Sequence, residues 1–301
     1  MRPKRWQIVT LSIVTVIVVA AGLYAIFGSS GKNNAFQPQE EFRLTPWISI
    51  HIAGIDMSIN RAVFYLFLAT ALTTGAMIWV SKRMHDRPNK VQTAVEVAYD
   101  LTRNNIARGN LHDEKLERRW FPFVATLFFF IWFSNMLGYI PLPTGHEKID
   151  IFGAKIPTLS IYASTANISI PLALTLVVFA VYNIEGIRAK GFIGYLKSFI
   201  PAGVEGAAKA PIFVIEVISN LVRIISLSVR LFANILAGHL LILFMAGGLV
   251  VLLGLAPLGI FTLLMAIPFF LFEVGLVATL QAFIFSTLTA IYIGGATAEE
   301  H

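Results

Sequence analysis

One stretch of this chain, residues 211–293, is almost entirely apolar and limits the possible fold more than any other feature. Adjacent glycines at 247–248 and a proline at 257 divide it, so the pattern predicts two helices, about 211–246 and 257–293. Each is longer than the roughly 20 residues that an upright membrane span requires. Such helices fit a bilayer if they are strongly tilted or run partly along it. The expected fold class is therefore an all-α membrane protein.

Shorter apolar runs repeat this pattern in the rest of the chain. Four of them are long enough to cross a bilayer, at residues 7–27, 62–80, 121–139 and 168–184. Only 13% of the residues are charged, whereas a soluble domain carries roughly 25%. A short amphipathic helix at the membrane interface is also expected, because apolar residues recur at helical spacing in 91–98. The sequence thus predicts a polytopic protein with about six transmembrane helices.

Basic residues alternate between the two ends of these predicted spans. The N-terminal flank carries three Lys/Arg residues, segment 82–120 nine and segment 188–209 four, whereas segments 28–61 and 140–167 carry three and two. Because loops rich in Lys and Arg stay in the cytoplasm, both termini are expected there. The run at 7–27 exceeds the about 7–15 apolar residues of a cleavable signal peptide, which favours a retained helix. Cleavage near Gly28-Ser29-Ser30 is the open alternative.

Composition excludes or disfavours several classes of chemistry. The chain has no cysteine, which excludes disulfides, thiol catalysis and cysteine-based metal sites. Its six histidines lack HExxH or similar ligand spacing, and Gly31-Lys32 is only a fragment of a phosphate-binding loop. The net charge of +6 arises from short loops between apolar runs, where basic residues set membrane topology. We therefore expect no metal, no cofactor, no nucleotide site and no nucleic-acid partner.

Ionisable side chains become very rare after Lys209. Before the terminal Glu299-Glu300-His301, the acidic, basic and histidine residues are Glu216, Arg223, Arg230, His239 and Glu273. A charge near the middle of a bilayer costs at least about 2.5–3.5 kcal/mol on insertion scales, so residues of this kind are functional by default if they face protein or water. This part of the chain is therefore expected to translocate ions.

The chain accordingly divides into four expected parts. They are an N-terminal hydrophobic helix, as an extra span or a signal, at 1–30, an extracytoplasmic segment at 31–61, three transmembrane spans with basic cytoplasmic loops at 62–210, and two long tilted helices forming the ion-translocation site at 211–301.

The spacing of the rare ionisable residues predicts a polar seam along one helix. Glu216, Arg223 and Arg230 are seven residues apart, so they lie on one helix face. Further polar residues fall on or beside this face, namely Ser219, Asn220, Ser226 and Asn234. His239 follows Arg230 by nine residues, which places it about half a turn away and roughly 13 Å further along the axis.

Structural explanations remain open for part of this set. Glu216 and Arg223 could form a purely structural pair or reach the interface, and His239 could be a packing histidine. Arg230 is harder to explain in this way, because it lies deep in an apolar helix and stays charged at physiological pH. In the last predicted helix, Glu273 and Gln281 are eight residues apart on adjacent parts of one surface. Local surroundings can bring the protonation of a His or Glu side chain near neutral pH, as a proton relay requires.

Three segments carry a resemblance to a known family. Ser226-Leu-Ser-Val-Arg230-Leu-Phe-Ala-Asn234-Ile-Leu-Ala-Gly-His239 strongly resembles the signature helix of subunit a of F-type ATP synthases. Gln281-Ala-Phe-Ile-Phe, Thr287-Leu-Thr-Ala-Ile-Tyr292 and the closing Glu-Glu-His are similar to the last helix of that subunit. Ser134-Asn-Met-Leu-Gly-Tyr-Ile-Pro141 resembles an earlier segment of it. The resemblance covers about residues 40–301.

This resemblance implies a non-catalytic stator subunit in a bacterial plasma (inner) membrane. Its implied partners are the ring of c subunits, the b subunits of the peripheral stalk, other ATP synthase subunits and the lipid bilayer. Protons would enter through one half-channel, neutralise a ring carboxylate, and leave through a second half-channel after rotation. By resemblance Arg230 is the essential arginine, Asn234 and Gln281 are polar residues near it, and Glu216 belongs to the access path. His239 and Glu273 resemble a His/Glu pair that some members carry in reverse order.

The sequence departs from the family pattern in two places. Glu273 precedes Gln281 by eight residues where the family pattern has seven, which would turn Glu273 about 100° from the family position. The family has five spans beginning outside, so the run at 7–27 is an addition. The alternatives to a proton-translocating subunit are a sodium-translocating version, a secondary transporter, an assembly scaffold and a membrane enzyme. Two repeated halves with broken helices, typical of secondary transporters, are not evident in the sequence.

Overall fold

The computed structural model describes most of the chain after residue 43. The described residues are 14, 18, 22, 44, 46–52, 55–56, 58–82, 90–111, 113–140, 148–151, 154–157, 163–200, 206–245 and 258–298. The predicted span at 7–27 therefore lies outside the described residues except at three positions, and the possible cleavage zone at 28–30 lies wholly outside them.

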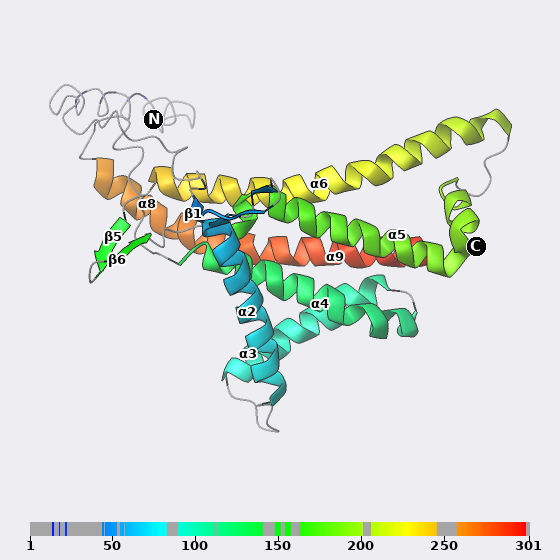
Figure 1. Cartoon of the computed structure of the whole chain (residues 1–301), viewed down its shortest axis with the longest axis horizontal. Coiled ribbons are helices and arrows are strands. Elements are labelled where there is room, and N and C mark those ends of the chain that lie inside the picture. The colour runs from blue at the N-terminus through cyan, green and yellow to red at the C-terminus, as the bar shows by residue number, and fades with distance from the viewer. Residues whose placement is uncertain are drawn as a thin grey trace, which may run out of the picture. The chain divides into compact units, whose positions relative to one another are not determined.

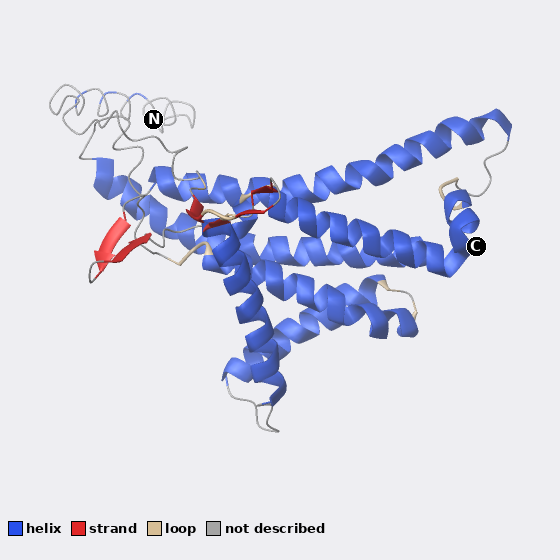
Figure 2. Ribbon diagram, viewed as in Figure 1, coloured by secondary structure: helices blue, strands red, loops and turns tan. Residues whose placement is uncertain are grey.

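Five helices in the described part of the chain are long and apolar enough to cross a membrane. Four of them are α2 (Arg61–Lys82), α4 (Glu114–Leu137), α5 (Ser169–Lys197) and α6 (Lys209–Leu243) (Figure 1). The fifth, Leu264–Thr297, combines the end of α8 (Leu258–Phe272), a π-helix η6 (Glu273–Val277) and α9 (Ala278–Thr297). Figure 2 shows how helices dominate the architecture. The predicted all-α, multi-pass fold is thereby confirmed.

Shorter elements connect these helices. A helix is present where the sequence predicts one at 91–98: α3 (Lys90–Asp100) continues into a π-helix, η2 (Leu101–Arg108). Three small antiparallel pairs were not predicted: β1 (Pro46–Ile48) with β4 (Ile59–Asn60), β2 (His51–Ile52) with β3 (Ile55–Asp56), and β5 (Lys148–Ile151) with β6 (Ala154–Pro157). Strands this short produce no detectable two-residue periodicity in the sequence. Single-turn 3-10 helices η3 (Ser164–Ala166) and η4 (Gly206–Ala208) precede α5 and α6.

The chain forms two compact units. One comprises Met1–Arg43 and Ala237–Glu273, and so contains the last residues of α6 together with α8. The other comprises Leu44–Leu236 and Val274–His301, with α2 to α5, most of α6 and α9.

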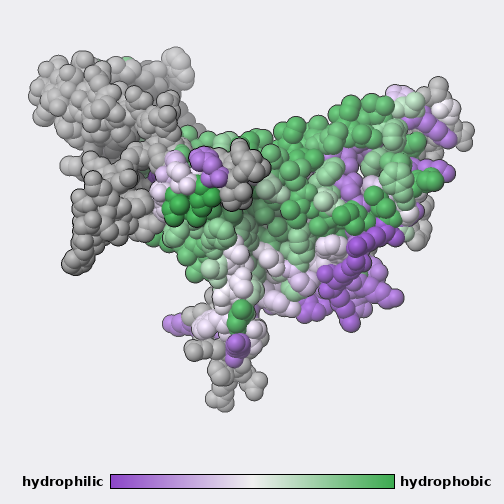
Figure 3. All heavy atoms as spheres, viewed as in Figure 1, coloured by the Kyte–Doolittle hydropathy of each residue, from purple (hydrophilic) through white to green (hydrophobic). Residues whose placement is uncertain are grey.

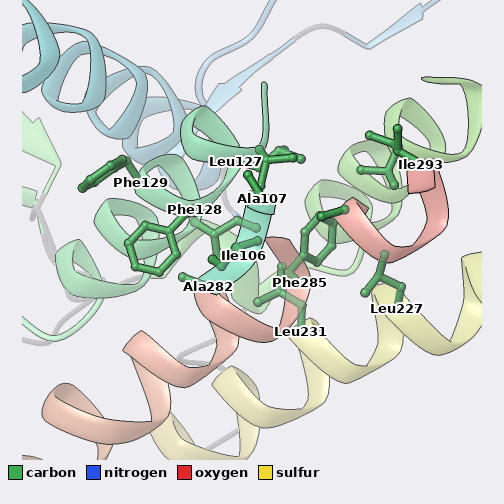
Figure 4. Packing of buried hydrophobic residues seen from close by; sticks show 14 of the residues in the cluster. Ile106, Ala107, Leu127, Phe128, Phe129, Leu227, Leu231, Ala282, Phe285 and Ile293 are labelled. Carbon is green, nitrogen blue, oxygen red and sulfur yellow. The ribbon is translucent and has the colours of Figure 1, made fainter. Parts of the chain in front are cut away.

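The larger unit is built around α9, which contacts α4, α5 and η2. Its core joins side chains from η2, α4, α6 and α9, among them Ile106, Phe128, Leu231 and Phe285, all 3% exposed or less (Figure 4). Close approach requires a glycine at Gly294, because a Cβ there would overlap the backbone carbonyl oxygen of Asn110. The packing fixes the faces that α6 and α9 present to each other.

Charged residues gather at one end of α4. Asp113 caps the helix by accepting a hydrogen bond from the Lys115 amide at 3.1 Å, and Glu114 and Glu117 occupy the first turn, where acidic side chains are favourable. These residues explain why α4 begins before the apolar run predicted at 121–139. Figure 3 shows hydrophilic side chains near this end and hydrophobic ones along α6.

Candidate functional site

Arg230 lies on an exposed face of α6 rather than in the helix packing. Ser226 and Asn234, one turn to either side, are exposed on the same face. The large neighbours on this surface are apolar: Ile225 is 62% exposed and Val229 40% exposed. Among the described residues, no carboxylate pairs with Arg230. The larger unit therefore presents a permanent positive charge, with two polar neighbours, on a largely apolar surface.

A second group of polar residues on α6 faces a cavity instead. Glu216, Asn220 and Arg223 line a space of about 330 Å³ between α6, α5 and α9. The other lining residues come from α5, from the turn that follows it, and from α9 with the residue after it: Tyr182, Lys190, Tyr195, Ser198, Phe199, Ile291, Tyr292, Gly295, Ala296 and Ala298. Every one of these residues belongs to the larger unit.

Hydrogen bonds fix the wall of this cavity. Tyr182 Oη donates to Asn220 Oδ1 at 2.6 Å, and Tyr195 Oη donates to Asn183 Oδ1 at 2.9 Å. The second bond depends on a break in α5, where Gly191 has φ +73° and the chain turns back. A left-handed backbone of this kind favours glycine. The turn brings the Tyr195 ring against Gly186, where a Cβ would overlap it.

Arg223 is held between two neighbours in the cavity. Its Nη2 lies 3.6 Å from Glu216 Oε1, close enough for an ion pair but too far for a hydrogen bond. Its guanidinium carbon lies 5.2 Å from the centre of the Tyr292 ring, which is a cation–π distance. The Arg223 and Glu216 side chains are 38% and 39% exposed, so the protein does not enclose either of them.

The predicted seam on α6 is thus shared between two environments. Glu216 and Arg223 face the cavity, Asn220 is buried in its wall, and Arg230 lies on the exposed face. Seven residues of an ideal α-helix fall about 20° short of two turns, so a row with this spacing drifts around the helix. The exposed face of α6 also carries Ser219.

In the smaller unit, Glu273 packs against the residue next to His239. A Cβ built on Gly238 would overlap the carboxyl carbon and both carboxyl oxygens of Glu273. The Glu273 side chain is 9% exposed, and His239 is half-buried. Only glycine at position 238 lets the carboxyl group approach the α6 backbone at this point.

The extra residue between Glu273 and Gln281 coincides with η6 (Glu273–Val277). A π-helix closes its hydrogen bonds over one more residue than an α-helix does, and such turns commonly mark one inserted residue at a functional site. A π turn that absorbs one inserted residue would cancel the rotation of about 100° that a regular α-helix imposes.

Gln281 itself is 4% exposed in α9, close to a set of contacts that hold the start of that helix. Asn135 Nδ2 donates to the Ala278 carbonyl at 3.3 Å and accepts at Oδ1 from Thr165 at 2.7 Å. Trp132 Nε1 donates to Thr279 Oγ1 at 3.2 Å.

Several residues of the site were not singled out from the sequence. They are Tyr182, Asn183 and Tyr195 of α5, Tyr292 of α9 and Asn135 of α4. Asn135 and Tyr292 lie within the segments that carry the family resemblance, which is a signal that could have found them. The α5 residues lie outside those segments. In a sequence, Tyr182 and Tyr195 cannot be distinguished from the tyrosines that commonly lie at a membrane interface. In the ranges that the structure describes, no three His, Asp or Glu side chains could hold a metal ion together.

Comparison with known proteins agrees with the sequence resemblance. The ATP synthase A chain family matches residues 63–294. Proteins named ATP synthase subunit a from Brucella ovis, Brucella suis and Brucella melitensis are each 34% identical over 271 residues. The alignment covers 89% of this chain and the whole of each of these relatives.

Proposed function

This chain belongs to the subunit a family of F-type ATP synthases, and from that premise we propose that it is the stator of a rotary proton pathway. It is a multi-pass integral membrane protein and part of the ATP synthase complex. In the proposal it faces a ring of c subunits, and the b subunits of the peripheral stalk hold it in place. Proton flow across it drives rotation, and rotation drives ATP synthesis on other chains.

The observation that carries the proposal is the position of Arg230. A guanidinium does not lose its proton in a protein, and exposing it to hydrocarbon is costly. Arg230 lies on a largely apolar face, between Ser226 and Asn234. A suitable partner for this face is therefore a mostly apolar protein surface that places a carboxylate beside Arg230. A c-ring helix with its ion-carrying carboxylate has these properties.

Two polar regions supply the half-channels in this proposal. The cavity at Glu216, Asn220 and Arg223 is the cytoplasmic one, and basic residues near it, such as Lys190, favour that side of the membrane. His239 and Glu273 supply the outer path, where both side chains can exchange protons. Asn234 and Gln281 serve as polar residues near the arginine, as the family implies.

Arg230 makes the two paths depend on rotation. Its charge attracts a deprotonated ring carboxylate and repels a proton that moves directly from one half-channel to the other. Each charge that crosses the membrane carries about 2.3 kcal/mol per 100 mV, so a direct leak would waste most of the driving force. A proton that binds the ring neutralises the carboxylate and lets that site move away into lipid.

Substitution of Arg230 tests this function. In membranes that contain the whole ATP synthase, Arg230→Ala should reduce proton-driven ATP synthesis to background, while native electrophoresis still shows an assembled complex. Arg230→Lys should also fail, because lysine lacks the planar fork and loses its proton more readily when desolvated. Arg118→Ala is a matched control, since Arg118 forms an exposed pair with Glu114, and exposed pairs contribute little. ATP synthesis by Arg230→Ala near the wild-type rate would contradict the proposal.

A further inference from the structure

The cavity between α5, α6 and α9 contains the kinds of atoms that also bind metal cations. Glu216, Asn220 and Ser198, which carry carboxylate, amide and hydroxyl oxygens, are among its lining residues. Oxygen atoms of these types are the usual ligands of hard cations. Metal cations greatly outnumber protons in cytoplasm, so a water-accessible carboxylate here needs a means of rejecting them.

We propose that Arg223 is the built-in counter-ion of Glu216 and excludes metal cations such as Na⁺ from this cavity. The inference rests on the proposed function, in which Glu216 belongs to the proton path. Its structural basis is the Arg223–Glu216 pair at 3.6 Å and the stacking of Arg223 on Tyr292. Arg223 is thus a specificity-determining residue, with a role distinct from that of Arg230.

The geometry discriminates between a proton and a metal ion. A proton bonds to a single oxygen lone pair, and a carboxylate offers about four, so it can add to Glu216 while Arg223 stays in place. A metal ion needs several oxygen ligands and would have to displace the guanidinium from Oε1. The Tyr292 ring opposes that displacement, because it holds the guanidinium from another side.

Other ionisable groups at the cavity do not replace Arg223. They are Lys190, Tyr182 and Tyr195 from α5 and Tyr292 from α9. A tyrosine side chain cannot carry a positive charge, and Tyr182 and Tyr195 donate their hydrogen bonds to asparagine side chains. Among the described residues, Arg223 is the cation found in ion-pair contact with Glu216.

The test measures ATP-driven proton pumping in inside-out vesicles that contain the whole ATP synthase, with NaCl or choline chloride at equal ionic strength outside. Wild-type pumping should be the same in both salts. In Arg223→Gln, Na⁺ can bind Glu216, so pumping in NaCl should be roughly threefold or more slower than in choline chloride. Arg223→Lys retains the charge and should be insensitive to Na⁺.

Further variants separate the possible causes. Arg188→Gln is the matched control, because Arg188 also pairs with a glutamate, Glu185, at 3.7 Å, but does not line the cavity. It should show no Na⁺ effect. Glu216→Gln combined with Arg223→Gln should pump slowly in both salts, and its residual rate should be the same in NaCl and choline chloride because the carboxylate is gone. If Arg223→Gln fails to assemble, Tyr292→Leu provides a second test, since it frees the guanidinium and should give a weaker Na⁺ effect, whereas Tyr292→Phe should give none.

Failure of this inference and failure of the proposed function give different results. Pumping by Arg223→Gln that is equally fast in both salts would overturn the inference, as would a Na⁺ effect that persists in the double variant. Neither result depends on Arg230. If Glu216→Gln alone pumps at the wild-type rate in choline chloride, the proposed proton path through Glu216 is wrong.

Discussion

Arg223 and Arg230 belong to the same helix and differ in what surrounds them. Arg223 has an internal carboxylate and an aromatic ring as neighbours, whereas Arg230 lies on an apolar exposed face. Seven residues turn the row by only about 20°, so the difference comes mainly from the neighbours: the ends of α5 and α9 line the cavity beside Arg223. In our proposals, Arg223 stays paired with Glu216 and determines which cation can bind there. Arg230 interacts instead with the carboxylate that each c subunit brings past it during rotation.

The sequence was enough to identify the functional candidates on α6, but it did not predict which side chains surround them. The rarity of charge after Lys209 was enough to find Arg223, Arg230 and Glu216 in the sequence. Their neighbours were not predictable, because Tyr182 and Tyr292 reach the cavity through the tertiary packing of α5 and α9. The spacing of residues along a helix predicts which of them share a face, but it does not predict which other helices pack against that face.

At Gly238 we expect a strong effect of the smallest possible substitution. Gly238→Ala places a methyl group where the Glu273 carboxyl lies, so the carboxyl must move. Displacement of a reacting group by about 1 Å can cost roughly 100-fold in rate, so proton-driven ATP synthesis should fall at least tenfold. Gly275→Ala is the control, because a Cβ at Gly275 meets nothing within 4 Å.

A second substitution tests whether the Gly238 effect acts through Glu273. Glu273→Asp shortens the side chain and should recover part of the activity lost in Gly238→Ala, which a double-mutant cycle would reveal as non-additivity. Additive losses would show that the methyl group at position 238 disturbs something other than Glu273.

At the scale of the elements, the existence of the long helices was predictable and their interruptions were not. Apolar runs set where a helix can cross a bilayer, and α2 and α6 lie close to the predicted ranges. The helix α5 extends past its predicted end at 184, because Glu185 is buried in ion pairs with Arg119 at 2.8 Å and Arg188 at 3.7 Å. A prediction based on hydropathy alone places the end of the helix at the charged residue, here Glu185. The π turn of η6 has the same composition as an α turn and leaves no compositional signal.

The π turn leads to a prediction about deletions in this helix. Removing Gly275 from η6 should convert the π turn into an α turn and keep Glu273 and Gln281 in their present rotational relation, so at least part of the proton-driven ATP synthesis should survive. Removing Ala282 from the regular part of α9 should rotate the preceding residues by about 100° and abolish activity.

Complex assembly should be compared in both deletion variants by native electrophoresis before the rates are interpreted. Equal loss of activity in the two assembled variants would mean that the π turn does not act as an inserted residue.

At the scale of the whole molecule, function depends on which side of the membrane each region meets. The spans of the described chain and their number could be predicted from apolar runs, and the alternation of basic loops predicts their orientation. The short strand pairs could not, because strands of two to four residues show no detectable periodicity. The division into two units could not, because it depends on contacts between segments far apart in sequence. The orientation remains a prediction, and it decides whether the cavity at Glu216 opens to the cytoplasm.

Cysteine labelling tests that orientation without background, because the chain has no cysteine of its own. A membrane-impermeant maleimide should label a cysteine at Ser30 or Gly145 from the outside of intact cells, and one at Asn89 or Gly194 in inside-out vesicles. Phe128→Cys is the control, since position 128 is 3% exposed and should react only after denaturation. Gly194 is the most informative position, because it precedes Tyr195 in the cavity wall. If it labels from outside, the cavity at Glu216 belongs to the entry side, and the two half-channels must be exchanged.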